Sequence, residues 1–494
     1  MGIIQKQAIK GTVFIFVGVL IGFATAGVVF PRILETRQIG LLSVMVSYSL
    51  IFAQLSSLGF ISTTTRMFSY FRDEKAKHHG FLFIAIMVTT VGVLLMLLVF
   101  FLMKPYLVAK SLEKSPLLAE YINAIIPLII VTVYFSILDH YFKVLYNAVI
   151  GIFLKEFLQR ILILVAILLY FFQILSFHQF VIVYISCFAI PTLVIIIVLI
   201  QKGHFNLKPQ LKFLSKDLVK TMVGMSLFGI IASATGVITF NIDRIMIDDI
   251  LGLCSTGIYT TAFFYGTLVI LPSRSLYKIA SPIIADAWKE NDTGKLKTIY
   301  FKSCLNQLVI GLFILIGIWA NIDNIFKILP AEFEAGRYVI LLIGLAYLFD
   351  MALGVNGSII GNSKYYPVGA LIMVFMVILI VITNLIFIPK YGIVGAAFAS
   401  ALSKFIVNLL RYLFVFWKFK MQPYNYKFII AILIGFVSYM AGYFMPEMKH
   451  FVVDIFVRSL LITILFGGLI LLFRVSDDIN RLFADIINRV RGYL

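Results

Sequence analysis

Long apolar runs separated by short polar connections dominate this sequence. A helix that crosses a bilayer needs about 20 mostly apolar residues, and the runs of that kind lie near residues 11–30, 39–60, 80–103, 121–146, 155–174, 180–200, 221–241, 256–280, 300–319, 337–358, 365–388, 393–416, 427–445 and 451–473. Hydrophobic residues make up 62% of the chain, against roughly 45–50% in soluble domains. The sequence therefore predicts an all-α polytopic membrane protein with about fourteen transmembrane helices and no sizeable soluble domain.

Lysine and arginine are distributed unequally between the two ends of these helices. If the N-terminus is cytoplasmic, the inner connections and termini carry about three quarters of the 41 Lys and Arg residues, as the positive-inside rule requires. This bias predicts that the N- and C-termini are both cytoplasmic. It also accounts for most of the net charge of +18, so no nucleic-acid partner is needed to explain the basic composition.

A short pattern occurs twice in the chain. Each copy has a basic residue near the outer end of a helix, a short polar loop, and a Gly-aliphatic pair that opens the next helix. The pairs are Gly40-Leu41 and Gly257-Ile258, and six runs precede the basic linker between the copies. Internal repeats joined in this way are typical of secondary transporters.

The repeat predicts two pseudo-symmetric lobes of six helices, related by a pseudo-two-fold axis along the membrane normal. The predicted parts are an N-lobe at 1–200, a cytoplasmic basic linker at 201–220, a C-lobe at 221–416, two further membrane helices at 427–473, and a cytoplasmic amphipathic helix at 474–494. In this last segment Ile479, Leu482 and Phe483 share one face and Arg481 and Asp485 the other, which is typical of a helix lying on a membrane surface.

The segment NIDRIMIDDILGLCSTGIYTTA, residues 241–262, resembles a signature of the polysaccharide transporter family, within the multidrug/oligosaccharidyl-lipid/polysaccharide (MOP) exporter superfamily. An Asp-basic pair is followed by Leu-Gly and then by Gly-aliphatic-Tyr. The stretches ETRQIGLLSVMVSYSLIFAQLSSLGF, LPSRSLYKIASPIIADAW and IPKYGIVGAAFASALS fit the same family.

The resemblance implies a MATE-like exporter fold and a flippase rather than an enzyme. Such a flippase moves undecaprenyl-diphosphate-linked oligosaccharide repeat units across the bacterial plasma membrane for O-antigen and other polysaccharide biosynthesis. The implied partners are the lipid-linked oligosaccharide, membrane lipids, a coupling proton or sodium ion, and the polysaccharide polymerase and glycosyltransferases of the pathway.

Charged and polar residues within the runs are the candidates for a substrate cavity, because a charge at a helix centre costs about 2.5–3.5 kcal/mol on insertion scales. Arg274 leads this group, since it follows Pro272, where a helix can loosen, and since guanidinium binds phosphate bidentately. The alternative for the arginines is snorkelling to the cytoplasmic headgroups. The predicted cavity residues are Arg274, Lys278, Arg66, Arg160, Lys404, Gln54 and Asn408.

Four further residues are candidates for a gate or for coupling. Asp243 and Arg244 form either a local ion pair or an outer gate, and their neighbours Asp248 and Asp249 are expected to be solvated loop charges. Asp350 lies well inside a C-lobe helix, where it could bind a proton or cation or pair with Lys404. Asp139 is the deep acid of the N-terminal half.

Two other functions remain open on the sequence alone. A drug or cation antiporter of the same superfamily would need a deep carboxylate in the N-terminal half, but the first two helices have none and Asp139 lies near a cytoplasmic end. A polysaccharide polymerase or glycosyltransferase would need a large catalytic outer loop, whereas the longest outer connection, near 104–120, has no acid pair or nucleophile constellation. The three cysteines lack paired spacing, so neither a metal nor another cofactor is predicted.

Overall fold

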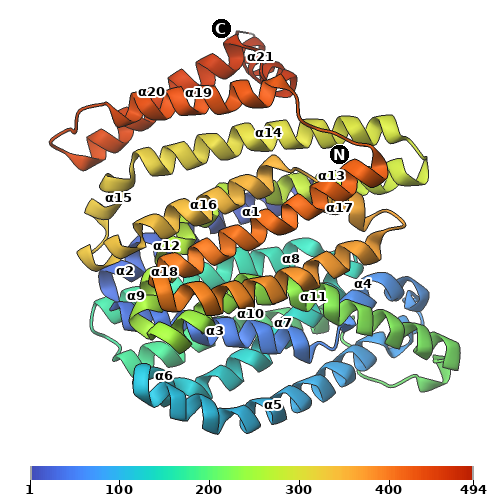
Figure 1. Cartoon of the computed structure of the whole chain (residues 1–494). Coiled ribbons are helices and arrows are strands. Elements are labelled where there is room, and N and C mark those ends of the chain that lie inside the picture. The colour runs from blue at the N-terminus through green and yellow to red at the C-terminus, as the bar shows by residue number, and fades with distance from the viewer. Residues whose placement is uncertain (1–2, 492–494) are drawn as a thin grey trace. The chain divides into compact units, whose positions relative to one another are not determined.

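The computed structural model describes residues 3–491 and contains only helices in that range (Figure 1). By length and composition, twelve helices of the described residues could cross a membrane. One of them, α18 (Tyr366–Phe419), is broken at Gly392, where φ is 60° and ψ is −140°, so it comprises two predicted runs. The run at 155–174 is helical within Ala148–Phe171, although its charged residues reduce its apolar character. Each of the fourteen predicted runs therefore corresponds to a helix, to part of one, or to consecutive helical segments, as at 256–280, which includes the end of α12, η6 and the start of α13.

The chain divides into two compact units, Met1–Thr260 and Thr261–Leu494. This boundary lies beyond the predicted linker, because α11 (Lys216–Leu251) packs against α3 (Thr36–Ser56) and α4 (Phe60–Phe71). The predicted lobe boundaries at 200 and 221 remain a prediction.

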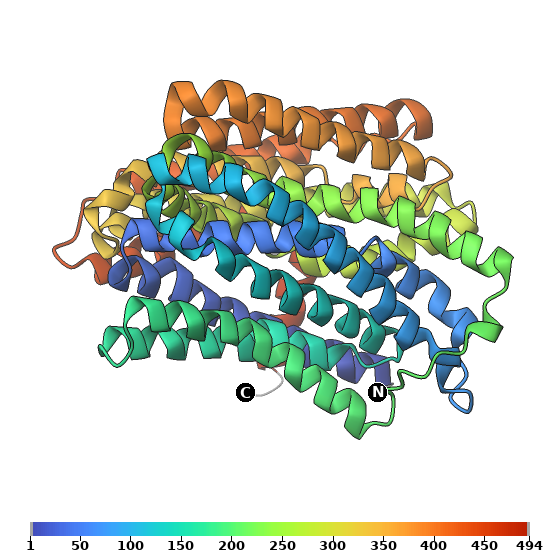
Figure 2. The same ribbon diagram turned by 90° about the horizontal axis from the view of Figure 1, so that it is seen from below.

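The first unit contains α1 to α11 and the start of α12. Its elements are α1 (Ile3–Gly22), η1 (Phe23–Val29), α2 (Phe30–Ile33), α3, α4, η2 (Lys77–Gly80), α5 (Phe81–Lys114), α6 (Pro116–Tyr121), η3 (Ile122–Ala124), α7 (Ile125–Val144), α8 (Ala148–Ile152), η4 (Phe153–Leu158), α9 (Gln159–Phe171), α10 (Phe177–Gln201), η5 (Leu211–Phe213) and α11. Aromatic side chains from α4, α5 and α7, including Phe68, Phe81 and Tyr141, meet edge to face or stack in its core. Within the predicted linker, residues 202–215 connect α10 to α11 and contain the short turn η5, whereas residues 216–220 already belong to α11 (Figure 2).

Two helices of this unit begin at equivalent positions of the predicted repeat and touch there. A Cβ on Gly40 of α3 would lie 2.1 Å from the carbonyl oxygen of Leu253, and a Cβ on Gly257 of α12 (Leu253–Thr267) would lie 1.9 Å from that of Thr36. One turn further on, the hydroxyls of Ser43 and Thr260 are 2.8 Å apart. The contact is reciprocal, since each glycine approaches the first residue of the other helix.

The second unit contains the rest of α12 and the following elements. These are η6 (Leu268–Ile270), α13 (Ser273–Lys289), α14 (Thr293–Ala320), α15 (Ile322–Ile328), η7 (Ala331–Gly336), α16 (Arg337–Ala352), α17 (Asn356–Gly361), α18, α19 (Tyr426–Tyr443), α20 (Phe451–Leu472) and α21 (Asp477–Arg491). Helices α14, α19 and α20 lie side by side and pack on one another (Figure 1). These three helices share one apolar core with α13 and α17, and Tyr300, Cys304 and Phe466 belong to it.

The C-terminal helix α21 begins where the sequence predicts a helix. The hydroxyl of Ser476 accepts a hydrogen bond from the Ile479 amide at 3.3 Å, as an N-cap residue does. Asp478 is held by Lys302 of α14 at 2.7 Å, whereas Leu482 and Phe483 are exposed. An exposed apolar face is compatible with the predicted position on a membrane surface, which stays a prediction, and residues 492–494 of the predicted segment lie outside the described residues.

Two connections are more helical than the sequence suggested. We expected an irregular outer connection near 104–120, but α5 continues through Pro105 to Lys114 and α6 begins at Pro116. We also expected a loop after residue 241, but α11 continues to Leu251. Both helices run on because they pack against each other at these ends, which the hydropathy of either segment does not reveal.

Candidate functional site

The membrane helix that carries Arg274 is interrupted directly before this residue. Helix α12 ends at Thr267, a short 3₁₀ turn follows, and α13 begins at Ser273 with Pro272 as its N-cap. Proline has no amide hydrogen and cannot continue the hydrogen bonding of a preceding helix. The predicted loosening of the helix at Pro272 is therefore present in the structure.

Arg274 and Lys278 lie on the same face of α13, one turn apart, and both are exposed. Within residues 3–491, neither side chain forms a hydrogen bond or an ion pair. Two adjacent cations without a protein counter-charge leave their positive potential available to a ligand.

A buried hydrogen bond fixes the helix break from the opposite side. Ser273, which is 1% exposed, donates to Oε1 of Gln307 on α14. Sequence analysis missed this pair, because Gln307 lies 34 residues away in an otherwise apolar helix. The break is thus a defined feature of the second unit, with Ser273 buried and Arg274, the next residue, exposed.

Asp350, Lys404 and Asn408 form one polar cluster between α16 and α18. Nζ of Lys404 lies 2.8 Å from Oδ2 of Asp350, Asn408 donates to Oδ1 of the same carboxylate, and Lys404 lies 4.5 Å above the Tyr347 ring. The structure contains the pair with Lys404 that the sequence offered as the alternative to a free Asp350. The charges of this cluster therefore neutralise each other.

Gln54 and Arg66 occupy different surroundings in the first unit. Nε2 of Gln54 donates to the hydroxyl of Ser233 on α11 at 2.8 Å, so Gln54 contributes to the packing of α3 on α11. Arg66 lies on α4, is exposed, and has no hydrogen-bond or ion-pair partner among the described residues. It resembles Arg274 and Lys278 in this respect.

Arg160 and Asp139 are both engaged by protein groups. Arg160 contacts Glu156 at 2.6 Å and donates to the carbonyl oxygen of Gly18 at 2.5 Å. Asp139 is 8% exposed, and Lys143 contacts its Oδ2 at 2.5 Å. A neutralised arginine is a weaker candidate for phosphate binding than an exposed one.

Four charged residues lie along the last three turns of α11. Asp243 accepts a hydrogen bond from the Tyr259 hydroxyl at 2.8 Å, while Nη1 of Arg244 donates to the carbonyl oxygen of Phe240 at 3.0 Å. Asp248 and Asp249 continue the same helix.

The expectation that Asp248 and Asp249 are solvated loop charges is wrong. Asp248 is 6% exposed and accepts a hydrogen bond from Ser115 at 2.6 Å, and Asp249 forms an ion pair with Lys110 at 2.5 Å. Lys110 lies near the end of α5, and Ser115 joins α5 to α6, so two contacts hold this part of the chain to the end of α11.

The candidate cavity residues thus form two groups. Arg274, Lys278 and Arg66 are exposed cations, whereas Arg160, Lys404, Gln54 and Asn408 are bound to other side chains or to main-chain carbonyl oxygens. The described residues contain no cluster of three or more His, Cys, Asp or Glu side chains that could hold a metal ion.

The architecture is that of a multi-pass membrane protein, with twelve described helices long and apolar enough to cross a membrane. A solved structure entitled "Lipid II flippase MurJ, inward closed conformation" is similar to this chain with a TM-score of 0.73 and 13% identity, over 95% of this chain and 100% of that chain. It is also similar to a structure entitled "Inward-facing conformation of a multidrug resistance MATE family transporter of the MOP superfamily", with a TM-score of 0.63 and 14% identity, over 80% of this chain and 93% of that chain. The predicted all-helical, MATE-like fold is therefore confirmed.

Sequence similarity defines the family more closely. Residues 8–288, more than half of the chain, match the family described as "Polysaccharide biosynthesis protein", and the chain belongs to this family. It is 24% identical to the capsular polysaccharide biosynthesis protein CapF of Staphylococcus aureus, over 37% of this chain and 46% of the relative. It is also 24% identical to the probable low-salt glycan biosynthesis flippase Agl15 of Haloferax volcanii, over 46% of this chain and 48% of the relative. The chain thus spans about half the length of each relative.

Proposed function

We propose that this protein is a flippase that moves undecaprenyl-diphosphate-linked oligosaccharides across the bacterial plasma membrane, with both termini in the cytoplasm. Family membership and the similarity to a probable glycan biosynthesis flippase support a lipid-linked glycan as substrate. The observation that carries the proposal is the exposed guanidinium of Arg274, which follows a break in a membrane helix and has no counter-charge among the described residues. The protein acts as a transporter and not as an enzyme, and glycosyltransferases and a polymerase supply and consume its substrate.

Arg274 binds the diphosphate from the cytoplasm-facing side in this proposal. The guanidinium can donate two parallel hydrogen bonds to phosphate oxygens, and each charge-assisted contact is worth about 1.5–3 kcal/mol. Lys278 adds charge one turn away, and Arg66 is a further exposed cation of this kind. Lys404 can assist only if its ion pair with Asp350 opens.

Asp350 is our candidate for ion coupling, and Asp139 is a second one. A proton or sodium ion on Asp350 would compete with Lys404 for the carboxylate, so binding of the ion would release a cation inside the second unit. Asp350→Asn should then abolish the pH dependence of transport, and unchanged transport with unchanged pH dependence would exclude this role. We assign Asp243 and Arg244 to the outer gate, supported by their position near the end of α11.

The test of the flippase is complementation of a strain that lacks its polysaccharide flippase. Arg274→Ala should abolish surface polysaccharide, and Arg274→Lys should restore part of it, since lysine keeps the charge but loses the bidentate geometry. Lys289→Ala is the matched control, because Lys289 is an exposed cation at the other end of the same helix. Each variant is first shown to reach the membrane in equal amount.

Two outcomes would contradict the proposal, one for the flippase function and one for the function of Arg274. If the wild-type protein does not restore surface polysaccharide in its own host background, it is not a flippase of this pathway. If Arg274→Ala works as well as Lys289→Ala, then Arg274 only snorkels to the headgroups, and Arg66 or Lys404 must provide the cation for the diphosphate.

A further inference from the structure

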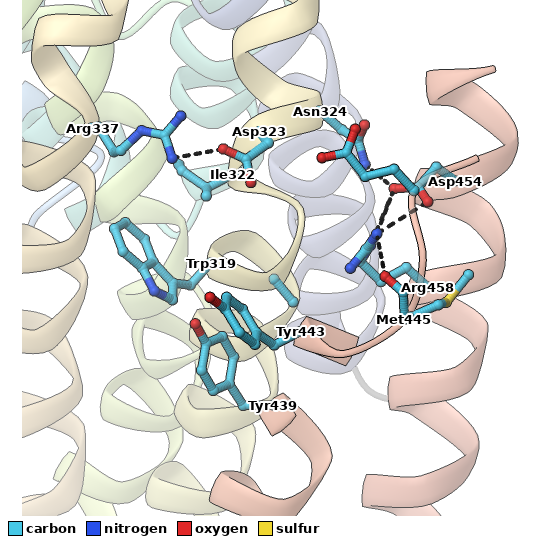
Figure 3. Close-up of a pocket in the computed structure, with 12 residues that line it drawn as sticks. Trp319, Ile322, Asp323, Asn324, Arg337, Tyr439, Tyr443, Met445, Asp454 and Arg458 are labelled. Atoms are coloured by element: carbon cyan, nitrogen blue, oxygen red, sulfur yellow. Dashed lines mark hydrogen bonds and ion pairs between the residues drawn. The ribbon is translucent and has the colours of Figure 1, made fainter. Parts of the chain in front are cut away.

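A polar cavity lies in the second unit, and its lining does not include Arg274. It occupies about 370 Å³ and is formed where α14, α16, α19 and α20 have their ends near α15 (Figure 3). In the predicted topology these ends face the outside of the cell. The volume falls within the roughly 300–1,000 Å³ typical of small-molecule sites.

Aromatic rings form one side of this cavity. Trp319, Tyr439 and Tyr443 lie together there (Figure 3), and the centroids of the two tyrosine rings are 5.9 Å apart. Tyr443 is 62% exposed, so its ring is accessible to a ligand. Each of these residues combines an apolar face with a hydrogen-bonding group at its edge.

Paired charges form the other sides. Arg337 contacts Asp323 at 2.6 Å. Deeper in the cavity, Arg458 contacts Asp454 at 3.1 Å and also donates to the carbonyl oxygen of Gly442. Because each arginine is already bound to a carboxylate (Figure 3), the cavity offers little net attraction to a phosphate or another anion.

One buried acceptor in the cavity has no donor. Asn324 is 3% exposed and donates through Nδ2 to Asp454, but its Oδ1 has no hydrogen-bond partner within residues 3–491. A buried carbonyl oxygen without a donor costs about 1–3 kcal/mol. Asn324 lines the cavity, but this oxygen is enclosed, so the side chain must turn toward the cavity to accept a hydrogen bond from a ligand hydroxyl, and that bond would recover the free energy.

These features together select one class of ligand. The paired arginines disfavour an anion, and a metal ion lacks the ligand cluster that it needs among the described residues. A purely apolar molecule would leave the Asn324 acceptor unsatisfied. A pyranose ring has both an apolar C–H face for the aromatic side and hydroxyl donors for the polar side.

We propose that this cavity binds a saccharide at the outer ends of α14, α16, α19 and α20. The site is separate from Arg274, and the inference goes beyond the proposed flippase because it concerns binding of a glycan rather than movement of a lipid. Tyr443 and Trp319 stack on the sugar ring, and Asn324 accepts from one of its hydroxyls.

The experiment is saturation-transfer difference NMR on the purified full chain in lipid nanodiscs. The probes are the oligosaccharide released by mild acid from the lipid-linked pool of the host and short oligomers of glucose and of N-acetylglucosamine. We expect saturable transfer, strongest at the ring C–H protons of one sugar face. Tyr443→Ala should weaken binding about threefold to tenfold, from the loss of one aromatic contact.

Tyr426→Ala is the matched control, since Tyr426 is also an exposed tyrosine of α19, 66% exposed, at the opposite end of the helix. It should bind the probes as the wild type does. Absence of saturable transfer from every probe would overturn the proposal. An equal effect of both tyrosine variants would also overturn it, and would assign Tyr443 to the aromatic belt at the membrane interface. Because the assay measures binding without transport, its outcome is independent of the complementation test.

Discussion

Substitution of Gly257 by alanine tests the reciprocal contact between α3 and α12. The added Cβ would lie 1.9 Å from the carbonyl oxygen of Thr36, a main-chain atom that cannot move without its helix. Relief requires the two helices to separate by roughly 1 Å, and overpacking of this kind costs about 1–3 kcal/mol. We take the upper end of this range, because the neighbour is main chain.

The intrinsic preference of alanine for a helix opposes this cost. Replacing a glycine in a helix interior by alanine gains about 0.5–1 kcal/mol. The net penalty is then about 2 kcal/mol, which corresponds to a factor of about 30 in the equilibrium constant for closing the contact. Gly236→Ala is the matched control, because it lies in α11 of the same unit and a Cβ there would meet nothing within 4 Å.

The assay is disulfide crosslinking between cysteines placed at Ser43 and Thr260, whose hydroxyls are 2.8 Å apart, in a protein whose three native cysteines are replaced. The crosslink should form readily with Gly257 in place. Gly257→Ala should slow crosslinking in membranes and lower the thermal midpoint, whereas Gly236→Ala should do neither. If the two alanine variants behave alike in both measurements, the close approach of α3 and α12 is refuted.

Three further predictions concern the polar residues. Lys404→Met leaves the Asp350 carboxylate without its counter-charge and should lower the free energy of unfolding by about 3 kcal/mol. The double variant Lys404→Met with Asp350→Asn should lose less, and thermal denaturation measures both losses. Gly151→Ala places a Cβ 1.7 Å from Oδ1 of Asp139 and should cost about 1–3 kcal/mol in the same assay, while the open-space glycine control stays neutral. A hydrogen bond from a lysine of α14 holds the pKa of Asp478 below its ordinary value, so this carboxylate stabilises the docked α21 above about pH 4 and the stability is lost as the pH falls through the lowered pKa. An environment-sensitive dye on α21 should report undocking in acid, and undocking that is independent of pH between 2 and 6 would contradict this reasoning.

The helices and their order could be predicted because each one must satisfy its own main-chain hydrogen bonds in the bilayer, so hydropathy alone marks them. Gly40 and Gly257 could also be singled out from the repeat. Their function as close-contact positions could not be predicted, because the main-chain carbonyl group that each glycine faces belongs to another helix far away in the sequence. Sequence spacing carries no direct record of contacts between residues 217 positions apart.

The candidate site could be predicted only in part, because the sequence does not show which distant residues contact each other. Lys404 and Asn408 could be singled out as polar residues within an apolar run, and Asp350 as a possible partner of Lys404. The hydrogen bond that fixes the helix break before Arg274 could not be predicted, because Ser273 bonds to Gln307, which lies in a separate apolar run. Whether a membrane arginine is free or neutralised is decided by such tertiary contacts.

The tertiary contacts of the charged residues at the end of α11 restrict how this helix can move. Asp248 is bound to Ser115, which joins α5 to α6, and Asp249 is bound to Lys110 of α5, so any movement that separates α11 from the end of α5 must break both contacts. Each hydrogen bond to a charged group is worth about 1.5–3 kcal/mol, and Asp248 would lose its donor while still largely buried. The lower-energy course is for the end of α11 to move together with α5 and α6. The outer gate that we propose at Asp243 and Arg244 must then open at another contact of α11, such as the hydrogen bond between Asp243 and Tyr259 of α12.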